Sequence, residues 1–351
     1  MNFNYATNLS RLLRGERVLR PLAVTYYVTT RCNFGCAYCE DFGVQRNAQA
    51  EPGLPLEEAV RVLRVIRSGT DALILTGGEP LLYPDIDELV ARARRDLRFG
   101  QITLLTNASL LAEHPDVPPL LDRLVVSLDS VDTDTWSGTL NVTREVAERV
   151  LANLRAARQA RRAPVVIVNC VLTPDTLAGV DALLAFCREH GLLASFSPQA
   201  VRNWPRYELL VSADYRALLE RLMTLKRRGA PLAGSLDYLR VLRDLASYDC
   251  YPALVPRVMP GGELIYPCRP IEKDGGTHGG RPCNLREVAS WDAAMAIAAR
   301  EYGPPPRVCT SCFQQCFAEP SLMQARPFSL IGEWLRYAAS RRAGLATYAP
   351  G

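Results

Sequence analysis

Short β-branched segments alternate with amphipathic segments from residue 22 to about residue 200, and this alternation constrains the fold more than any other feature of the sequence. Strands separated by helices pair in parallel through right-handed crossovers. We therefore predict an α/β fold, a partial, TIM-like (β/α)6 barrel, with a doubly wound sheet as the alternative. The predicted strands span residues 22–29, 72–75, 101–105, 123–128, 165–171 and 194–197, and the helices between them span residues 56–67, 85–96, 143–159 and 178–190.

The cysteines indicate a metal-binding protein. The 351 residues include 11 cysteines. We find no secretion signal and expect a cytoplasmic location, where cysteines serve as metal ligands or nucleophiles more often than as disulfides. One group lies within residues 32–39 and another within residues 250–316. Cys170 and Cys187 lie in apolar runs between the groups and are expected to pack as small hydrophobic side chains.

The first cysteine group directly follows the first predicted strand. Cys32, Cys36 and Cys39 have the spacing C-x3-C-x2-C. Three thiolates can hold three irons of a [4Fe-4S] cube and leave the fourth iron free to chelate a small molecule. A zinc site is the alternative, although structural zinc usually has four ligands in two C-x2-C pairs.

Two motifs together resemble those of the radical S-adenosylmethionine (SAM) superfamily. The cysteine loop has Tyr38 at the superfamily's aromatic position, and a Gly-Gly-Glu-Pro stretch ends the second strand. The resemblance implies that the three cysteines hold a [4Fe-4S] cluster that chelates SAM. It also implies that the stretch binds the methionyl amino group of SAM, with the carboxylate of Glu79 complementing that cation. The residues of the stretch are Gly77, Gly78, Glu79 and Pro80.

The same resemblance implies further contacts with SAM. Ser127 ends the fourth strand and resembles a residue that contacts the ribose. Asn169 on the fifth strand is expected to line the site, as is Ser197 or Gln199 after the sixth.

The partner of the SAM carboxylate is not evident from the sequence. Many members of the superfamily have an Arg-Gly pair after the fourth strand, and its Arg binds this carboxylate. The corresponding region of this chain reads Trp136-Ser137-Gly138. Arg144 and Arg202 are the candidates to replace the missing Arg.

The second cysteine group resembles the SPASM/twitch auxiliary-cluster domain found in many radical SAM enzymes. A predicted hairpin over residues 261–268 ends in a cysteine, and a C-x2-C-x3-C run follows at residues 309–316. We expect one auxiliary [4Fe-4S] cluster, as in twitch domains, because six cysteines cannot complete two four-thiolate sites. A zinc ribbon is the alternative. The expected ligands are Cys250, Cys268, Cys309 and Cys312, with Cys316 as a substitute for one of them and Cys283 as a spare.

We predict a barrel core with additions at both ends. Residues 250–320 show little periodicity and are expected to bury little apolar surface, so that a metal staple would be needed there. Residues 327–342 are expected to form a docking helix, with a helix on a membrane surface as the alternative. The predicted parts are an N-terminal extension (1–21), the core (22–203), a helical connection (204–249) with helices over 212–227 and 235–245, the auxiliary-cluster domain (250–320), and a C-terminal helix and tail (321–351).

The resemblance implies a radical SAM enzyme. Reduced by a one-electron donor such as flavodoxin or ferredoxin, it would cleave SAM to a 5′-deoxyadenosyl radical that abstracts hydrogen from a substrate. We expect a small polar metabolite, such as a sugar, an aminocyclitol or a nucleoside-like intermediate. A peptide maturase and a lipid-modifying enzyme are the alternatives. An iron–sulfur electron-transfer protein is the non-enzyme alternative, and the stretch over residues 77–80 argues against it, because an electron carrier has no use for a SAM site.

Charge excludes one class of partner. The 41 Lys and Arg residues are interleaved with 37 Asp and Glu residues, for a net charge of +4. Nucleic-acid binders concentrate their basic residues in a patch or stripe, so we expect no nucleic-acid partner. No apolar run approaches the roughly 20 residues that cross a bilayer, and membrane association is therefore a minor expectation.

Overall fold

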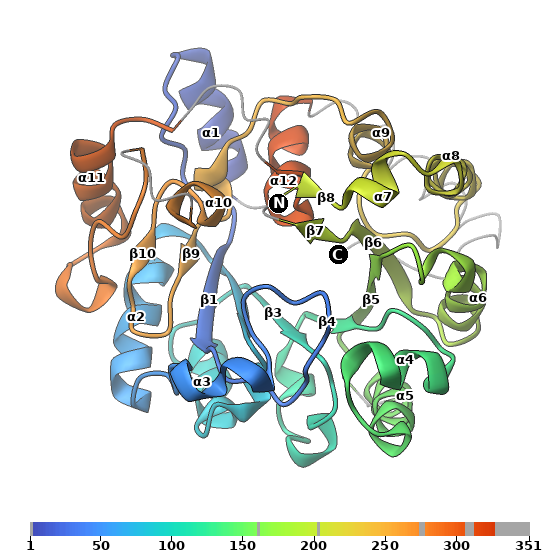
Figure 1. Cartoon of the computed structure of the whole chain (residues 1–351). Helices are drawn as coiled ribbons and strands as arrows, with labels where there is room; N and C mark the ends of the chain where they lie inside the picture. Colours follow the sequence, from blue (N-terminus) through green and yellow to red (C-terminus); the bar gives the residue numbers. More distant parts are fainter. Residues whose placement is uncertain (1–2, 160–161, 202–203, 274–277, 306–311, 327–351) are drawn as a thin grey trace. The chain divides into compact units, whose positions relative to one another are not determined.

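The structure is a computed structural model that describes residues 3–159, 162–201, 204–273, 278–305 and 312–326 (Figure 1). Its contacts divide the chain into two compact units, which are described separately. The first unit comprises residues 1–126, 133–165 and 251–305. The second comprises residues 127–132, 166–250 and 306–351. The predicted domains follow other boundaries and stay a prediction.

A largely parallel sheet forms the centre of the first unit (Figure 1). Its strands lie in the order β10-β9-β1-β2-β3-β4. All neighbours are parallel except β10, which runs antiparallel to β9. The strands are β1 (Val24–Thr29), β2 (Ala72–Gly77), β3 (Gln101–Thr106), β4 (Arg123–Ser127), β9 (Arg257–Val258) and β10 (Leu264–Ile265).

Alternation of side chains along each strand separates the two faces of this sheet. Leu73 and Leu75 of β2 are almost fully buried, whereas Ile74 between them is only half-buried. The chain crosses between parallel strands through helices that bury their apolar stripes on one side. Glu57 and Glu58 in the first turn of α2 favour its N-terminus through the helix dipole. The helices are α2 (Leu56–Gly69), α3 (Ile86–Arg95), α4 (Thr133–Leu140) and α5 (Arg144–Gln159).

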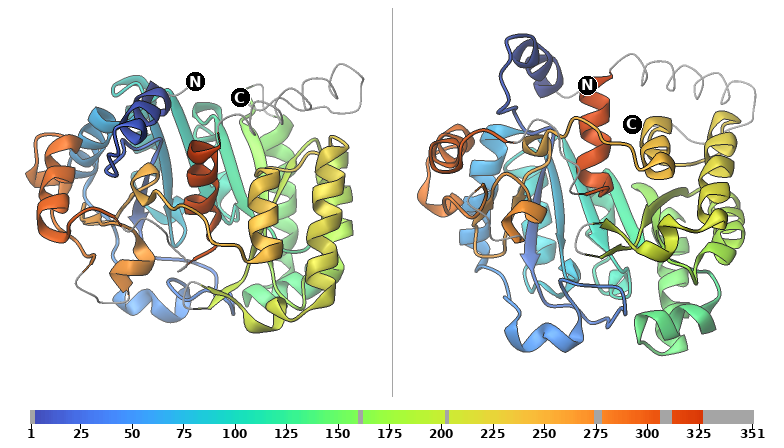
Figure 2. Two further views of the ribbon diagram at one scale, coloured as in Figure 1. Left: turned by 90° about the horizontal axis from the view of Figure 1, so that it is seen from above. Right: turned by 45° about the horizontal axis from the view of Figure 1, so that its top comes forward.

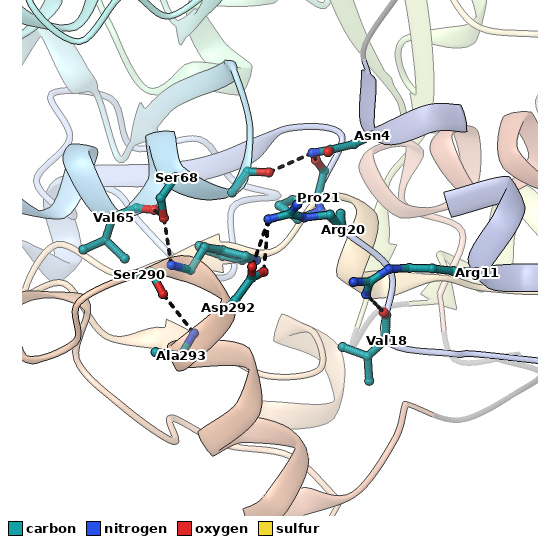
Figure 3. Close-up of polar contacts among 12 residues, drawn as sticks. Asn4, Arg11, Val18, Arg20, Pro21, Val65, Ser68, Ser290, Asp292 and Ala293 are labelled. Carbon is teal, nitrogen blue, oxygen red and sulfur yellow. Dashed lines mark hydrogen bonds and ion pairs between the residues drawn. The ribbon is translucent and has the colours of Figure 1, made fainter. Parts of the chain in front are cut away.

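Two further helices, α1 (Phe3–Leu13) and α11 (Trp291–Tyr302), dock at the C-terminal end of α2 (Figure 3). The amide of Asn4 donates hydrogen bonds to the carbonyls of Pro21 and Gly69, at 2.8 and 2.7 Å. Arg20 pairs with Asp292 of α11 at 3.1 Å. The ring of Trp291 packs directly on Gly69, where a Cβ atom would lie 2.4 Å from the ring.

Residues 251–305 bury more apolar surface than the sequence led us to expect. Leu264, Ile265 and Trp291 are at most 1% exposed. Leu254 and Val255 join Leu19 in an apolar cluster. The reason is that β9 pairs with β1, so that this segment extends the sheet of the first unit and shares its core. A short helix, α10 (Arg269–Lys273), follows the β9–β10 hairpin.

The second unit contains the remaining strands. β5 (Val165–Leu172) and β6 (Leu193–Pro198) are parallel, and β7 (Ala200–Val201) and β8 (Trp204–Pro205) form a small antiparallel pair. Helices α8 and α9 lie side by side (Figure 2), and α12 contacts α9. The helices are α6 (Val180–Glu189), α7 (Tyr207–Leu210), α8 (Ala213–Arg227), α9 (Leu236–Asp244) and α12 (Gln315–Ala325). Cys170 and Cys187 are fully buried, as predicted.

The structure confirms the predicted strands and helices to within a few residues and adds elements that were not predicted. The additions include α1, α4, α11 and α12. Within the described ranges, no helix is both long and apolar enough to cross a bilayer. The predicted helix over residues 327–342 lies outside the described residues.

We predict that Asn4→Ala loosens the docking of α1. The substitution leaves the carbonyls of Pro21 and Gly69 without their buried donor, which costs about 1–3 kcal/mol. Thermal unfolding should shift to lower temperature, and hydrogen exchange over residues 3–13 should accelerate. Leu13→Ala is the control. Leu13 lies on the same helix and is 83% exposed, so its replacement should leave both measurements unchanged. Equal behaviour of the two variants would contradict the assignment.

Candidate functional site

The cysteine loop leaves the sheet at the end of β1 and is fastened to the end of β2. The amide of Gly78 donates to the carbonyl of Thr29 at 3.0 Å, and the amide of Glu79 donates to the carbonyl of Arg31 at 2.8 Å. The pairing of β1 with β2, whose register shifts between Tyr27 and Thr29, therefore continues past the strands into the loop that carries Cys32.

Two glycines make this approach possible. A Cβ atom on Gly77 would lie 2.2 Å from the carbonyl oxygen of Thr29, and one on Gly78 would lie 2.3 Å from that of Arg31. Both distances are far below van der Waals contact, and in both cases the obstacle is backbone. Glycine is required here because the two chains lie too close for any side chain.

Hydrogen bonds also hold the loop at other points. Asn47 both accepts from the amide of Cys32 at 3.1 Å and donates to its carbonyl at 2.8 Å. The amides of Gly35 and Ala37 donate to the carbonyls of Leu140 and Thr139 at the end of α4. The loop is therefore fixed by backbone contacts on both sides of Cys36.

The three thiols suit an iron–sulfur cluster. Cys32 is buried, and Cys36 and Cys39 are half-buried. Burial raises the pKa of the Cys32 thiol to about 11. The amides of Phe34 and Phe42 donate to the sulfurs of Cys32 and Cys39, each at 3.4 Å. Such N–H···S bonds stabilise thiolate charge, which is what an iron cluster requires of its ligands.

No three His, Cys, Asp or Glu side chains within the described ranges come close enough together to hold a single metal ion. This finding concerns single ions. In a [4Fe-4S] cube each thiolate binds a different iron, so the ligands are spread around the cube.

Glu79 lies inside the protein. It is 0% exposed. Its Oε1 accepts from the hydroxyl of Thr106 at 2.7 Å and from the amide of Leu81 at 3.0 Å, and its Oε2 accepts from the amide of Asn107 at 2.7 Å. Burial raises the pKa of Glu79, and these three hydrogen bonds oppose the rise. The contact between Glu79 and the SAM amino group stays a prediction, but here the carboxylate serves the chain's own groups.

The other predicted SAM contacts lie on or just after strands in the second unit. Ser127 is exposed and Asn169 is half-buried. The amide of Leu128, next to Ser127, donates to the carbonyl of Asn169 at 3.0 Å. The end of β4 at Ser127 therefore lies beside the part of β5 that carries Asn169. Ser197 and Gln199 are half-buried near the end of β6.

Of the two candidates for the SAM carboxylate partner, one lies within the described residues. Arg144 begins α5 and is engaged with Glu148 at 2.9 Å and Asp134 at 3.2 Å, with 58% of its side chain exposed. Arg202 lies outside the described residues.

The expected auxiliary ligands fall into both units. In the second unit, the hydroxyl of Tyr248 donates to the carbonyl of Cys312 at 3.2 Å, which brings the segment before Cys250 against Cys312. Cys250 and Cys312 are buried, and Cys316 is half-buried on α12. Cys309 lies outside the described residues.

In the first unit, Cys268 is buried immediately after the β9–β10 hairpin. Cys283 lies on the segment that pairs with β10 and is half-buried. Burial raises the pKa of its thiol to about 11, and Glu287 and Glu301 add to the rise.

Sequence reasoning missed an ionic connection between the two cysteine segments of the first unit. Asp41, two residues after Cys39, pairs with Lys273 and lies 3.8 Å from Arg269, and both basic residues belong to the helix that follows Cys268. Acidic residues in a loop, here Glu40 and Asp41, and two basic residues on a distant helix give no sequence signal of this contact.

Comparison with known proteins identifies the family. The model of the radical SAM superfamily matches residues 26–187. A GTP 3′,8-cyclase from Mycobacterium sp. (strain KMS) is 34% identical over 340 residues, covering 90% of this chain and 91% of the relative. The chain belongs to the radical SAM superfamily. Cys32, Cys36, Cys39 and the stretch over residues 77–80 all lie within the matched region.

Other relatives match over shorter lengths. A GTP 3′,8-cyclase from Rhodococcus opacus (strain B4) is 31% identical over 227 residues, and this match spans 62% of each protein. GTP 3′,8-cyclase 2 from Mycobacterium bovis is 35% identical over 224 residues, which is 61% of each. These matches support the family assignment and extend over less than two thirds of either relative.

Solved structures confirm the fold class. Streptococcus suis SuiB bound to S-adenosylmethionine superposes with a TM-score of 0.64 at 21% identity, over 85% of this radical SAM chain and 71% of SuiB. The structure of anSMEcpe with bound AdoMet gives a TM-score of 0.59 at 13% identity, over 93% and 98% of the two chains. The predicted α/β fold is confirmed, and the [4Fe-4S] cluster and SAM predicted as cofactors are those of this superfamily.

We predict that Gly78→Ala disrupts the cysteine loop. The new methyl group would overlap the Arg31 carbonyl, and backbone displacement of this kind costs about 1–3 kcal/mol. The variant should unfold at lower temperature and hold less iron after anaerobic reconstitution. Gly138→Ala is the control, because a Cβ atom there meets nothing within 4 Å and alanine favours the helix. Wild-type iron content in Gly78→Ala would refute the close approach.

Proposed function

We propose that this chain is a radical SAM enzyme that abstracts a hydrogen atom from a purine nucleotide. The observation that carries the proposal is the 34% identity to a GTP 3′,8-cyclase over 90% of the chain, with the three-cysteine loop inside the matched length. A nucleotide is a special case of the small polar metabolite that the sequence suggested.

Each part of the loop has a task in this proposal. Cys32, Cys36 and Cys39 hold a [4Fe-4S] cluster, and Gly77 and Gly78 keep the SAM-binding strand end against the loop. When bound, the reduced cluster and SAM supply a 5′-deoxyadenosyl radical, which takes a hydrogen atom from the substrate. The protein's contribution is to hold substrate and cofactor in reacting geometry and to exclude water.

The charge beside the loop supports an anionic substrate. The guanidinium of Arg257 lies over the ring of Tyr27 at 6.0 Å, and Tyr27 contacts the ring of Phe42 at 5.8 Å. Phe42 adjoins Asp41, which pairs with basic residues of α10. Basic side chains outnumber acidic ones in these contacts, and Arg in particular binds phosphate in bidentate geometry. The basic residues are Arg257, Arg269, Lys273 and Arg281, and the acidic ones are Asp41 and Glu272.

The proposed reaction needs a protein that supplies single electrons. Flavodoxin and ferredoxin are the candidate donors, because the chemistry begins with a one-electron reduction of the cluster. A chemical reductant replaces this partner in the experiments below.

An auxiliary cluster in a SPASM/twitch-like region is part of the proposal. The buried thiols of Cys250 and Cys312, with Cys316 on α12, support a site in the second unit. Cys268, also expected as a ligand, is buried in the first unit. Reactive cysteines are usually accessible to solvent, whereas these thiols are buried or half-buried. Their burial therefore favours a role as iron–sulfur ligands.

Iron content tests both clusters. The reconstituted wild type should hold about eight irons per chain, in two cubes of four. Replacing Cys32, Cys36 and Cys39 by Ala should lower the content to about four and abolish SAM cleavage. A wild-type count near four together with one retained zinc would instead support the zinc ribbon.

The substrate class is tested by isotope transfer. The protein is incubated anaerobically with SAM, dithionite and ribose-deuterated GTP, and 5′-deoxyadenosine is analysed by mass spectrometry. We expect deuterium in 5′-deoxyadenosine, because the radical takes its hydrogen from the substrate. Guanosine is the matched comparison and should react with a higher KM, since it lacks the phosphates that the basic residues would bind.

Two outcomes would contradict the proposal at different levels. Formation of 5′-deoxyadenosine without deuterium from any nucleotide would exclude nucleotides as the substrate class and favour a peptide or a lipid. Absence of 5′-deoxyadenosine from a protein that holds its full iron content would exclude the reaction itself.

A further inference from the structure

A closed ring of hydrogen bonds joins the cysteine loop to the loop that follows β3. The side-chain amide (Nδ2) of Asn107 donates to Oδ1 of Asn33 at 2.8 Å, and the side-chain amide (Nδ2) of Asn33 donates to the hydroxyl of Ser109 at 2.9 Å. That hydroxyl donates to Oδ1 of Asn107 at 2.7 Å, which closes the ring. Asn33 lies directly between Cys32 and Phe34, so the ring holds the cysteine loop from a side chain within it.

The donor and acceptor roles within the ring are fixed by one another. Each of the three side chains donates one hydrogen bond and accepts one within the ring. Turning either amide would place two donors or two acceptors opposite each other, so only one arrangement satisfies all three groups. Hydrogen bonds linked in this way strengthen one another, and the loss of one weakens the rest.

Glu79, at the end of β2, holds the ring through the backbone of Asn107. Its buried carboxylate accepts from the backbone amide of Asn107 and from the hydroxyl of Thr106. This hydroxyl accepts in turn from the backbone amide of Ala108 at 2.9 Å. Asn153 of α5 donates to the carbonyl of Ala108 at 2.8 Å. The loop after β3 is therefore fixed from both β2 and α5.

The backbone of this loop carries strain that the network sustains. Ala108 has a φ of +61° and is fully buried. A left-handed conformation costs a residue with a Cβ atom roughly 1–2 kcal/mol, and it persists only where the surroundings impose it. The side chains of Asn33, Glu79, Thr106 and Asn153 hold the loop in this conformation. The loop therefore keeps Asn107 and Ser109 in one position.

We propose that Asn33, Asn107 and Ser109, anchored on Glu79, are positioning residues that set the cysteine loop, and hence its cluster, against the SAM-binding strand ends. The inference rests on the proposed function in that a cluster and SAM occupy this site. It gives Glu79 a role in the scaffold of the site that acts through Asn107.

The first test uses the protein without its cluster. Asn33→Ala opens the ring and should accelerate hydrogen exchange over residues 31–39, whereas exchange in β2 and β3 stays at the wild-type rate. Gln49→Ala removes an exposed amide shortly after the same loop and is the matched control, expected to leave exchange unchanged. Unchanged exchange over residues 31–39 in Asn33→Ala would overturn the proposal.

The second test uses the reconstituted protein. In Asn33→Ala we expect SAM to bind roughly 5–30-fold more weakly, the effect of losing one or two kcal/mol of hydrogen bonding. The change that SAM causes in the electron paramagnetic resonance spectrum of the reduced cluster should shrink, at unchanged auxiliary iron. Asn33→Asp keeps the acceptor for Asn107 and should lie between the wild type and Asn33→Ala. A merely structural role would leave the spectrum of folded protein unaltered.

A double-mutant cycle separates the ring from its members. Asn33→Ala and Asn107→Ala should together weaken SAM binding by little more than either alone, because each already breaks the same ring. Additive effects would overturn the proposal. A wild-type protein that holds no cluster would instead refute the proposed function, and the exchange experiment would still decide the ring.

Discussion

Backbone contact between the ends of β1 and β2 determines the position of the site. The carbonyls of Thr29 and Arg31 receive hydrogen bonds from Gly78 and Glu79, and the two chains lie so close that no Cβ atom fits between them. These hydrogen bonds follow a shift of register between Tyr27 and Thr29 and tie the loop to the end of β2, so that the parallel sheet supports the loop. A site on rigid elements holds its ligands more accurately than one on a free loop.

The first strand also organises the C-terminal segment. β1 pairs with β2 on one side and with β9 on the other, and Cys268 follows the hairpin that β9 begins. The ion pairs of Asp41 with α10 add a second connection. The side chains of these pairs are between 19% and 32% exposed, so that solvent screens them and each pair contributes little stability alone. Their effect is geometric, since they keep the chain after Cys39 beside the helix after Cys268.

The sequence was sufficient to locate the six strands from β1 to β6. Strands such as β5 are predictable because a run of β-branched residues with buried alternate positions has few other uses. Helix α12 was missed because Pro320 lies inside it, and β9 and β10 were too short to show a period. Pairing with β1, a long-range contact, is what makes these two-residue strands stable.

Within the site, sequence indicated which residues matter but not what they contact. Gly77 and Gly78 belong to the stretch that was assigned to SAM binding, and the atoms that lie closest to them here are backbone atoms of Thr29 and Arg31. Glu79 was assigned to a cation on SAM, which stays a prediction, and the sequence did not reveal that its two oxygens also accept from backbone and hydroxyl donors. A sequence motif indicates that one position must lack a side chain or that another must carry a hydrogen-bond acceptor. The identity of the neighbour depends on the fold.

The same reasoning explains why the substrate is the least predictable property of this chain. Its net charge of +4 is small and dispersed along the sequence, whereas the fold brings Arg269 and Lys273 to Asp41. If the substrate is a nucleotide, its phosphates carry more charge than this one carboxylate. The phosphates would therefore compete with Asp41 for Lys273 and Arg269, which Asp41 keeps oriented beside the cysteine loop. That competition weakens as salt rises, because partly exposed ion pairs are screened.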